Sequence, residues 1–203
     1  MTAAALAVCP IGTSVRAALG IAGTAPGQTV LVTGAGGGLG LHQIQVAKSV
    51  QARVLAVTSS RQKTEAVRAT GADEVIVSSD LKFSAEVWRL TQKQGADVVL
   101  DNVVTGTFRE SLRACAQNAT VVVLGNIAAQ PVELDPGLVI MRRIRIAGSG
   151  NATFADVDIA LHLLASGKVK PCIGCVLPFP KAAEGHAMLE QRAVTGRVVL
   201  QGW

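Results

Sequence analysis

The sequence predicts an α/β fold, a doubly wound parallel sheet with helices on both faces. Short apolar runs rich in β-branched residues, which are typical of buried strands, alternate with segments whose apolar residues recur at helical spacing. A glycine-rich turn at residues 34–40 joins the first of these runs to the next segment. Hydrophobic residues make up 49% of the 203 residues. A sheet that is covered on both faces needs a composition of this kind.

The predicted elements follow one another in a regular order. Strands are expected at residues 29–33, 53–58, 74–77, 96–101, 120–125 and 143–147. Helices are expected at residues 41–48, 61–70, 83–94, 105–115 and 154–166. Gly71 and Gly167 stand directly after two of these helices, where glycine commonly ends a helix. The repeated unit predicts about six parallel strands, with a ligand site at their carboxyl ends.

The glycine-rich turn has the features of a nucleotide-binding loop. The N-terminus of a helix presents unpaired amides and a partial positive charge, and both attract phosphate. Glycine lets the backbone approach a pyrophosphate that side chains would keep away. Aligned on Gly40, the dinucleotide fingerprint reads Ala35-x-Gly37-x-x-Gly40, with alanine in place of its first glycine. A plain tight turn is the alternative, and the strand and helix on either side favour the dinucleotide site.

Other nucleotide-binding loops have different requirements. A P-loop needs Lys and then Ser or Thr after its last glycine, whereas Leu41 and His42 follow Gly40 here. A methyltransferase loop is a further alternative. It usually has an acidic residue at the end of the second strand, and the lack of one in this sequence weakens that interpretation.

The end of the second strand indicates the choice of cofactor. An Asp or Glu at this position binds the ribose hydroxyls of NAD and repels a 2′-phosphate, and no acidic residue occurs before Glu65. Hydroxyls and cations are present instead, namely Thr58, Ser59, Ser60, Arg61 and Lys63. One charge-assisted hydrogen bond contributes about 1.5–3 kcal/mol, so this set predicts NADP (NADPH). A helix cap at residues 59–61 is the alternative.

Charge and composition exclude several partners. The net charge is +5, but the basic residues are scattered apart from Arg142, Arg143 and Arg145, and no aromatic residues lie among them. No apolar run reaches the ~18 residues of a membrane span, and the N-terminus lacks the basic region of a signal peptide. Four cysteines in this length do not require disulfides. We expect a cytoplasmic protein with a small-molecule substrate and no nucleic-acid or membrane partner.

Segments at both ends do not fit a lone sheet. Residues 10–21 predict a lead-in helix, and a strand, a helix and a strand are expected at residues 172–177, 181–191 and 197–200. The chain is therefore divided into a lead-in helix (1–22), an NAD(P)-binding domain (23–170) and a C-terminal return segment (171–203). The end segments need something to pack on, which indicates flanking segments of a larger protein.

Distinctive motifs stand at residues 26–40, 45–48, 52–58, 71–73, 167–171, 179–186 and 195–200. Together they resemble the medium-chain dehydrogenase/reductase superfamily, above all its zinc-type alcohol dehydrogenases and quinone oxidoreductases. The resemblance implies a Rossmann fold and hydride transfer between NADPH and a carbonyl, an alcohol or an activated alkene of the quinone or enoyl type. It also implies a preceding catalytic domain, which makes this chain the cofactor-binding portion. A stand-alone, non-catalytic NADPH-binding module is the alternative.

The resemblance further implies which residues contact the cofactor. The glycine loop would act through Gly36, Gly37, Gly38 and Leu39. The adenosine end would be held by Thr58, Ser59, Ser60, Arg61 and Lys63. The nicotinamide half would lie along Asp101, Asn102, Val103, Gly125 and Asn126, and Thr13 is assigned to the same site. Asp101 and Asn102 are equally typical of a turn.

Cys9 is a candidate zinc ligand. The run Cys9-Pro-Ile-Gly-Thr13 resembles the superfamily's zinc-binding cysteine, which stands four residues before a threonine. A catalytic zinc needs three protein ligands and this chain is expected to supply one, so zinc is expected only with the missing domain. A buried apolar thiol is the alternative. Cys172 and Cys175 fall in a predicted strand, where an odd step separates their side chains and argues against a redox pair.

The predicted strand at residues 143–147 is the expected edge of the sheet. An unpaired edge strand templates association with another chain. Members of the superfamily pair through this strand, so the resemblance implies a homodimer.

Overall fold

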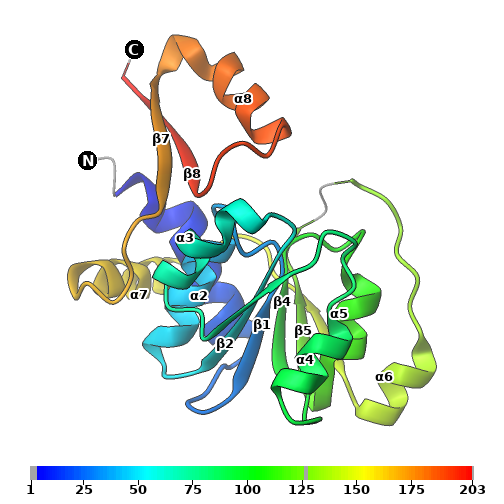
Figure 1. Cartoon of the computed structure of the whole chain (residues 1–203). Helices are drawn as coiled ribbons and strands as arrows, with labels where there is room; N and C mark the ends of the chain where they lie inside the picture. The colour runs from blue at the N-terminus through cyan, green and yellow to red at the C-terminus, as the bar shows by residue number, and fades with distance from the viewer. Residues whose placement is uncertain (1–3, 126–127, 203) are drawn as a thin grey trace.

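Figure 1 shows the protein as a computed structural model, which describes residues 4–125 and 128–202. A six-stranded sheet has the strand order β3-β2-β1-β4-β5-β6, and every pairing in it is parallel. Its strands are β1 (Thr29–Val32), β2 (Arg53–Thr58), β3 (Glu74–Val77), β4 (Ala96–Asp101), β5 (Cys115–Val123) and β6 (Arg145–Gly148). This is the order of the doubly wound dinucleotide-binding fold, so the predicted fold class is confirmed.

Helices cover both faces of the sheet (Figure 1). One face carries the lead-in helix, made of η1 (Ala7–Gly12), α1 (Thr13–Val15) and η2 (Arg16–Ile21), together with α2 (Gly40–Ser49), η3 (Arg61–Lys63), α3 (Thr64–Ala69) and α7 (Phe154–Ala165). The other face carries α4 (Ser84–Leu90), α5 (Phe108–Ala114) and α6 (Pro136–Arg142). Among the helices of the described residues, none is long and apolar enough to cross a membrane.

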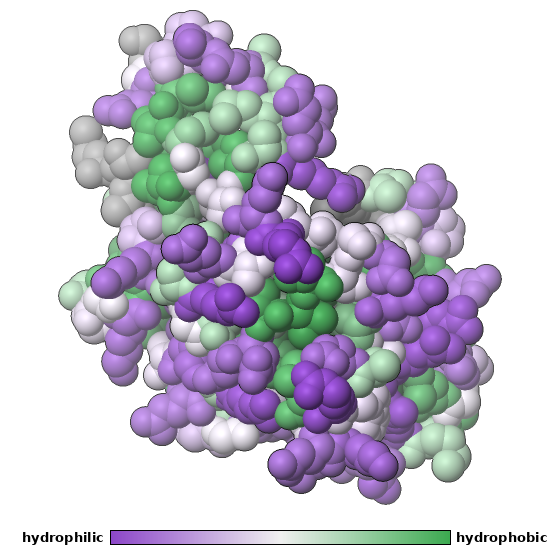
Figure 2. All heavy atoms as spheres, viewed as in Figure 1, coloured by the Kyte–Doolittle hydropathy of each residue, from purple (hydrophilic) through white to green (hydrophobic). Residues whose placement is uncertain are grey.

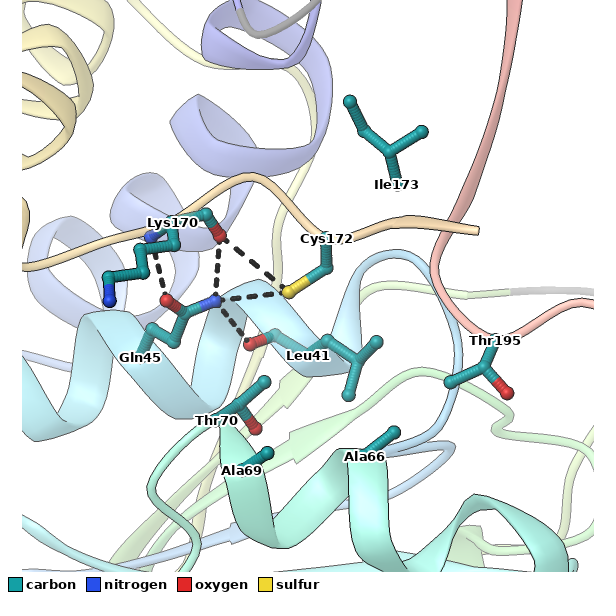
Figure 3. Close-up of a pocket in the computed structure, with 9 residues that line it drawn as sticks. All are labelled: Leu41, Gln45, Ala66, Ala69, Thr70, Lys170, Cys172, Ile173 and Thr195. Carbon is teal, nitrogen blue, oxygen red and sulfur yellow. Dashed lines mark hydrogen bonds between the residues drawn. The ribbon is translucent and has the colours of Figure 1, made fainter. Parts of the chain in front are cut away.

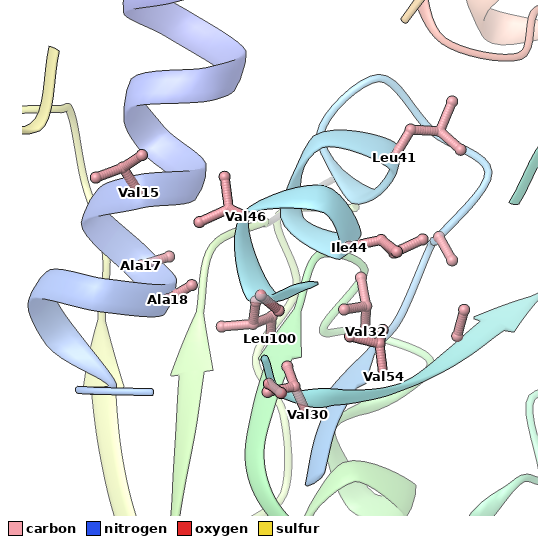
Figure 4. Close-up of a cluster of buried hydrophobic side chains, with 14 of the residues drawn as sticks. Val15, Ala17, Ala18, Val30, Val32, Leu41, Ile44, Val46, Val54 and Leu100 are labelled. Carbon is pink, nitrogen blue, oxygen red and sulfur yellow. The ribbon is translucent and has the colours of Figure 1, made fainter. Parts of the chain in front are cut away.

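Alternate residues of β1 point to two separate cores. Val30 and Val32 belong to one cluster with Ile44 of α2, whereas Leu31 belongs to the other with Leu112 of α5. Figure 4 shows the first cluster, in which side chains of the lead-in helix, α2 and the sheet meet. The lead-in helix therefore packs on this chain's own sheet. The sequence had suggested that this helix does not fit a lone sheet.

The C-terminal return segment forms a small unit of its own. Its strands β7 (Ile173–Pro178) and β8 (Arg197–Gln201) pair in parallel, and η4 (Phe179–Lys181) and α8 (Ala182–Glu190) connect them. In Figure 1 the unit stands above the sheet, and a bridge between Gly37 and Gly196 joins it to the glycine loop. Exposed apolar side chains gather on this unit (Figure 2), among them Val176, Leu189 and Leu200.

Two predicted helices are shorter in the structure. Helix α4 ends at Leu90 instead of residue 94, because Gln92 and Lys93 adopt left-handed backbone angles with φ of 52° and 67°. Helix α5 ends at Ala114 because Cys115 is extended and pairs with Ala96 as the first residue of β5. Strand β5 thus begins five residues before the predicted position of 120.

Helix α6 was not predicted at all. Asp135 accepts a hydrogen bond from the amide of Leu138 at 3.2 Å, and Pro136 occupies the first turn. An N-cap acid followed by proline is a recognised start signal for a helix. Arg143 then ends the helix with a left-handed φ of 51°, so β6 begins at Arg145 and not at residue 143. The strand does lie at the edge of the sheet, as predicted.

The four cysteines are free thiols. Cys172 precedes β7, and the register of that strand is irregular between Ile173 and Cys175. Burial raises the pKa of the Cys115 thiol to about 12, which keeps it protonated and unreactive at neutral pH.

Candidate functional site

The glycine loop, residues 33–39, lies between the end of β1 and the start of α2. Gly34 has a left-handed φ of +58°, and the amide of Ala35 donates to the carbonyl of Val57 at 2.9 Å. The amide of Gly37 turns back to the carbonyl of Gly34 at 3.0 Å. Within the described chain no side chain caps α2 at Leu39. The amides of Leu41 and His42 donate to the carbonyls of Gly37 and Leu39, at 3.2 and 3.0 Å. Among the described residues no backbone acceptor is found for the amides of Leu39 and Gly40, so these two are available to an anionic ligand.

The last glycine of the fingerprint is required by close packing. A Cβ on Gly40 would lie 2.7 Å from the Cα of Ala35 and 2.7 Å from the carbonyl oxygen of Gly34. The alanine that replaces the first glycine has a different environment. Ala35 is fully buried, and its methyl group joins the core cluster that contains Val30 and Ile44. The methyl group of Ala35, which departs from the fingerprint, therefore fills the core and does not point out from the loop.

Two cationic side chains lie across the loop. A Cβ on Gly36 would lie 2.7 Å from Cδ of Lys63, and a Cβ on Gly38 would overlap Cδ of Arg197. The Lys63 ammonium donates to the carbonyl of Val194 at 2.7 Å. Lys63 was among the predicted residues. Arg197 was not, although its segment was recognised as a superfamily motif.

The other predicted residues at the end of β2 differ in their exposure. Thr58 is buried, and its Oγ1 accepts a hydrogen bond from the amide of Ser60 at 3.2 Å, so it shapes the turn. Ser59 and Arg61 are exposed. The side chain of Ser60 makes no capping hydrogen bond to η3 within the described chain. The helix-cap interpretation therefore finds no support in the geometry.

Asp101 is enclosed and does not face the site. The residue has no exposed surface, and its carboxylate accepts hydrogen bonds from five donors. The donors are the hydroxyls of Thr33, Thr107 and Ser111 and the amides of Val103 and Val104. The side chain of Asp101 therefore orders the loop after β4, which is the turn role that its sequence also allowed.

Asn102 links that loop to the glycine loop and α2. Its Nδ2 donates to the carbonyl of Thr33 at 2.8 Å and to Oε1 of Gln43 at 2.7 Å, and its Oδ1 accepts from Nε2 of Gln43 at 3.0 Å. Gly125 packs against the carbonyl of Asn102, where no Cβ would fit. The structure thus brings the ends of β1, β4 and β5 together. Asn126 lies outside the described residues.

The residues of the lead-in helix do not form a metal centre by themselves. Cys9 is exposed, and its Sγ lies 3.4 Å from Nη2 of Arg197. Nowhere in residues 4–125 and 128–202 do three or more His, Cys, Asp or Glu side chains come together to hold a metal ion. A guanidinium beside a lone thiol does not fit a zinc site, so no chemistry is assigned to zinc here. The assignments of Cys9 to zinc and of half-buried Thr13 to the cofactor stay predictions.

A cavity of about 310 Å³ lies between α2, α3 and the C-terminal return segment (Figure 3). It is lined by Leu41, Gln45, Ala66, Ala69, Thr70, Lys170, Cys172, Ile173 and Thr195. Gln45 closes one side, since its Oε1 accepts from the amide of Lys170 at 2.7 Å and its Nε2 donates to the Lys170 carbonyl at 3.0 Å. None of the residues predicted to bind the cofactor lines this cavity.

His42 is a buried imidazole in the first turn of α2 with no exposed surface. Its Nδ1 lies 2.6 Å from the carbonyl oxygen of Gly38, and its Nε2 accepts from the amide of Cys172 at 3.0 Å. Both contacts are satisfied by the neutral tautomer with its proton on Nδ1. Burial, opposed by the hydrogen bond to Gly38 and aided by the charge of Arg197, lowers the pKa of His42.

A parallel sheet in this order, with an open helix start behind a glycine loop and cations across it, defines a dinucleotide-binding domain. The particular family follows from sequence comparison. The chain belongs to the zinc-binding dehydrogenase family, whose profile matches residues 38–166, and thereby to the medium-chain dehydrogenase/reductase superfamily of oxidoreductases. This membership sets the methyltransferase alternative aside.

Several relatives are similar over most of the chain. An acryloyl-coenzyme A reductase of Metallosphaera sedula is 41% identical over 175 residues, which are 86% of this chain and 51% of that protein. The crystal structure of AibC has a TM-score of 0.91 at 43% identity and covers 97% of this chain and 59% of that one. An NAD-dependent alcohol dehydrogenase has a TM-score of 0.91 at 35% identity, over 96% of this chain and 57% of that one.

A fourth relative was solved with ligands. The 2-octenoyl-CoA carboxylase reductase CinF, in complex with NADP and 2-octenoyl-CoA, has a TM-score of 0.84 at 29% identity and covers 95% of this chain and 48% of that one. This chain therefore spans about half the length of the relatives it matches.

Substitution of Gly40 tests the packing of the loop. We expect Gly40→Ala to lower the free energy of unfolding by about 1–3 kcal/mol, because its methyl group would meet backbone atoms that cannot move aside. Gly150→Ala is the control, since nothing lies within 4 Å of a Cβ there, and it should change stability by less than about 0.5 kcal/mol. Urea denaturation measures both. Equal effects of the two substitutions would contradict the packing argument.

The buried imidazole predicts a loss of stability in acid. Below about pH 6.5 the unfolded chain protonates His42, and the folded chain does so only at the lower pKa. The free energy of unfolding should therefore fall with pH in this window, by up to about 1.4 kcal/mol per pH unit. Urea denaturation at pH 7.5 and 5.5 should show a smaller loss for His42→Asn, which cannot titrate. Parallel losses would refute the prediction.

Proposed function

We propose that this chain is the NADPH-binding part of a medium-chain oxidoreductase that transfers hydride to or from a carbonyl, an alcohol or an activated alkene. The observation that carries the proposal is the open start of α2, with Lys63 and Arg197 laid across the glycine loop in front of it. Amides at a helix start and two cations form a site for a pyrophosphate. The nicotinamide, when bound, supplies the hydride.

The chain's own residues would bind and orient this cofactor. The glycine loop would receive the phosphates, and the exposed residues Ser59 and Arg61 at the end of β2 would receive the 2′-phosphate. The loop after β4, ordered by Asp101 and joined to α2 through Asn102 and Gln43, would form a rigid wall beside the nicotinamide half. Rigid walls of this kind lower the cost of ordering a bound cofactor.

The preference for NADPH over NADH rests on residues and not on the relatives. The relatives include both an NAD-dependent alcohol dehydrogenase and a reductase solved with NADP. At the end of β2 in this chain, Arg61 is exposed and the first acidic residue is Glu65 in α3. An uncompensated cation there attracts a 2′-phosphate, whereas a carboxylate would repel it.

An activated alkene conjugated to a thioester is the substrate class that we favour. The support is the 41% identity to an acryloyl-coenzyme A reductase, together with the 2-octenoyl-CoA bound to CinF. Turnover assays with enoyl thioesters, quinones and aldehydes distinguish these substrates. Binding of NADPH without turnover of any of them would support the alternative of a non-catalytic NADPH-binding module.

Calorimetry tests the cofactor. We expect NADPH to bind at least about tenfold more tightly than NADH, because one charge-assisted hydrogen bond to the 2′-phosphate is worth this much. Arg61→Ala should remove about tenfold in NADPH affinity and leave NADH affinity unchanged. Arg68→Ala, at an exposed cation in the last turn of α3, is the matched control and should alter neither. Equal affinities for the two cofactors in the unmodified chain would overturn the assignment.

We also propose that two copies of the chain pair through the edge strand β6. Ile146 on this strand is 37% exposed, and the neighbouring helix α6 exposes Ile140 and Met141 at 72% and 75%. An apolar edge that is unpaired within one chain is a template for a second sheet. Strand β6 of each copy would join the two sheets into one.

Sedimentation tests the pairing. A dimer is expected at micromolar concentration, and Ile146→Lys should convert it to a monomer because a charge at an edge opposes strand pairing. Ile159→Lys is the control, since Ile159 is similarly exposed at 42% but lies on α7. A monomeric wild-type chain, or dissociation by both substitutions alike, would contradict pairing through β6.

A further inference from the structure

His42 joins the glycine loop to the C-terminal return segment. Its Nδ1 donates to the carbonyl of Gly38 and its Nε2 accepts from the amide of Cys172. The carbonyl of Cys172 in turn accepts from the amide of Arg197 at 2.9 Å. The side chain of Arg197 returns to the loop and lies over Gly38. The four residues thus form a closed ring, in which the imidazole joins α2 to the C-terminal segment.

The first link determines the direction of a peptide plane. In the first turn of α2 the amides of His42 and Gln43 both donate to the carbonyl of Leu39, at 3.0 Å each, and the amide of Leu41 donates to Gly37. The Gly38 carbonyl receives the imidazole instead. In a trans peptide the C=O and the next N–H point in opposite directions. A Gly38 carbonyl held toward His42 therefore directs the Leu39 N–H away, out of the helix start.

The second link determines where Arg197 lies. The amide of Cys172 is held by His42, and one turn further along α2 Gln45 pairs with both backbone groups of Lys170. Residues 170–172 are thereby fastened along α2 before β7 begins. The amide of Arg197 is bonded to this segment at the carbonyl of Cys172. The backbone of Arg197 is thereby held where its side-chain methylenes lie over Gly38.

We propose that His42 is a positioning residue for the cofactor's pyrophosphate. It would orient one phosphate donor, the Leu39 amide, through Gly38, and a second, the Arg197 guanidinium, through Cys172. The inference rests on the proposed function for its ligand, while the ring itself is a property of the chain without ligand. No contact between the imidazole and the cofactor is involved.

Two variants of similar size break the ring at different points. The side-chain nitrogen of asparagine can take the place of Nδ1, so His42→Asn keeps the Gly38 link and releases Cys172. The terminal amide of glutamine reaches the place of Nε2, so His42→Gln keeps an acceptor for the Cys172 amide and releases Gly38. His162→Gln is the control, because the exposed His162 makes the same kind of contact, from Nδ1 to the carbonyl of Asp158 at 2.8 Å, on α7.

The binding experiment compares NADPH with 2′-AMP, which has the adenosine 2′-phosphate but no pyrophosphate. We expect His42→Asn and His42→Gln each to weaken NADPH binding about 5- to 10-fold, the value of one hydrogen bond that orients a charged group. Binding of 2′-AMP should be unchanged in both, and His162→Gln should change neither. Equal losses for NADPH and 2′-AMP, or no loss of NADPH affinity in either variant, would overturn the proposal.

Hydrogen exchange separates this inference from the proposed function. Without any ligand, exchange of the Cys172 amide should accelerate at least about tenfold in His42→Asn and stay slow in His42→Gln. Failure of the wild-type chain to bind NADPH would refute the proposed function and with it the ligand of this site. Unchanged exchange at Cys172 in His42→Asn would instead show that the ring does not hold the segment, whatever the cofactor.

Discussion

The close packing of α2 against the turn that follows β1 is the constraint on which the rest of the site depends. Gly40 lies directly on the backbone of Gly34 and Ala35, and a single added carbon would meet three backbone atoms within 2.9 Å. This contact sets both where the helix starts and how far its first amides stand from the strand. The overlying side chains of Lys63 and Arg197 take their places relative to that start. If the turn packed less closely, Lys63 and Arg197 would no longer lie in the same positions relative to the first amides of α2.

A buried carboxylate gives the neighbouring strand end the same rigidity. Removing an ionised carboxylate from water is costly unless hydrogen bonds replace the lost hydration. Asp101 meets this requirement with five donors, which come from the glycine loop, from the loop after β4, and from α5 and its N-cap. One of them, Thr33, also accepts from the amide of Asn102 at 3.0 Å. The side chain of Asp101 thus holds the end of β4 and the loop after it in place.

Local patterns predicted what is locally determined. Strands β2, β3 and β4 begin and end where their apolar runs do. Neighbours in the sheet bury β2 and β4 almost completely, whereas the edge strand β3 buries Ile76 and leaves Val77 40% exposed. Helix α6 was not predicted, although Asp135 and Pro136 signal its start. Its apolar residues Ile140 and Met141 are exposed, so the sequence shows no stripe of polar and apolar residues at helical spacing. Arg197 could not be placed over Gly38 by any local pattern. That contact depends on how the C-terminal segment is fastened to α2, which is a property of tertiary structure alone.

The two cations that lie across the glycine loop have no carboxylate partners within the described part of the chain. Within the described residues, Lys63 meets a carbonyl and Arg197 meets a thiol, and neither forms an ion pair with a carboxylate. Partial burial and the charge of Arg192 lower the pKa of Lys63, so the free protein holds this cation against repulsion. Like charges gathered at the positive end of a helix repel one another and are repelled by the helix dipole. In the function proposed above, the two linked phosphates of the cofactor would offset that repulsion on binding, and this would contribute to the affinity.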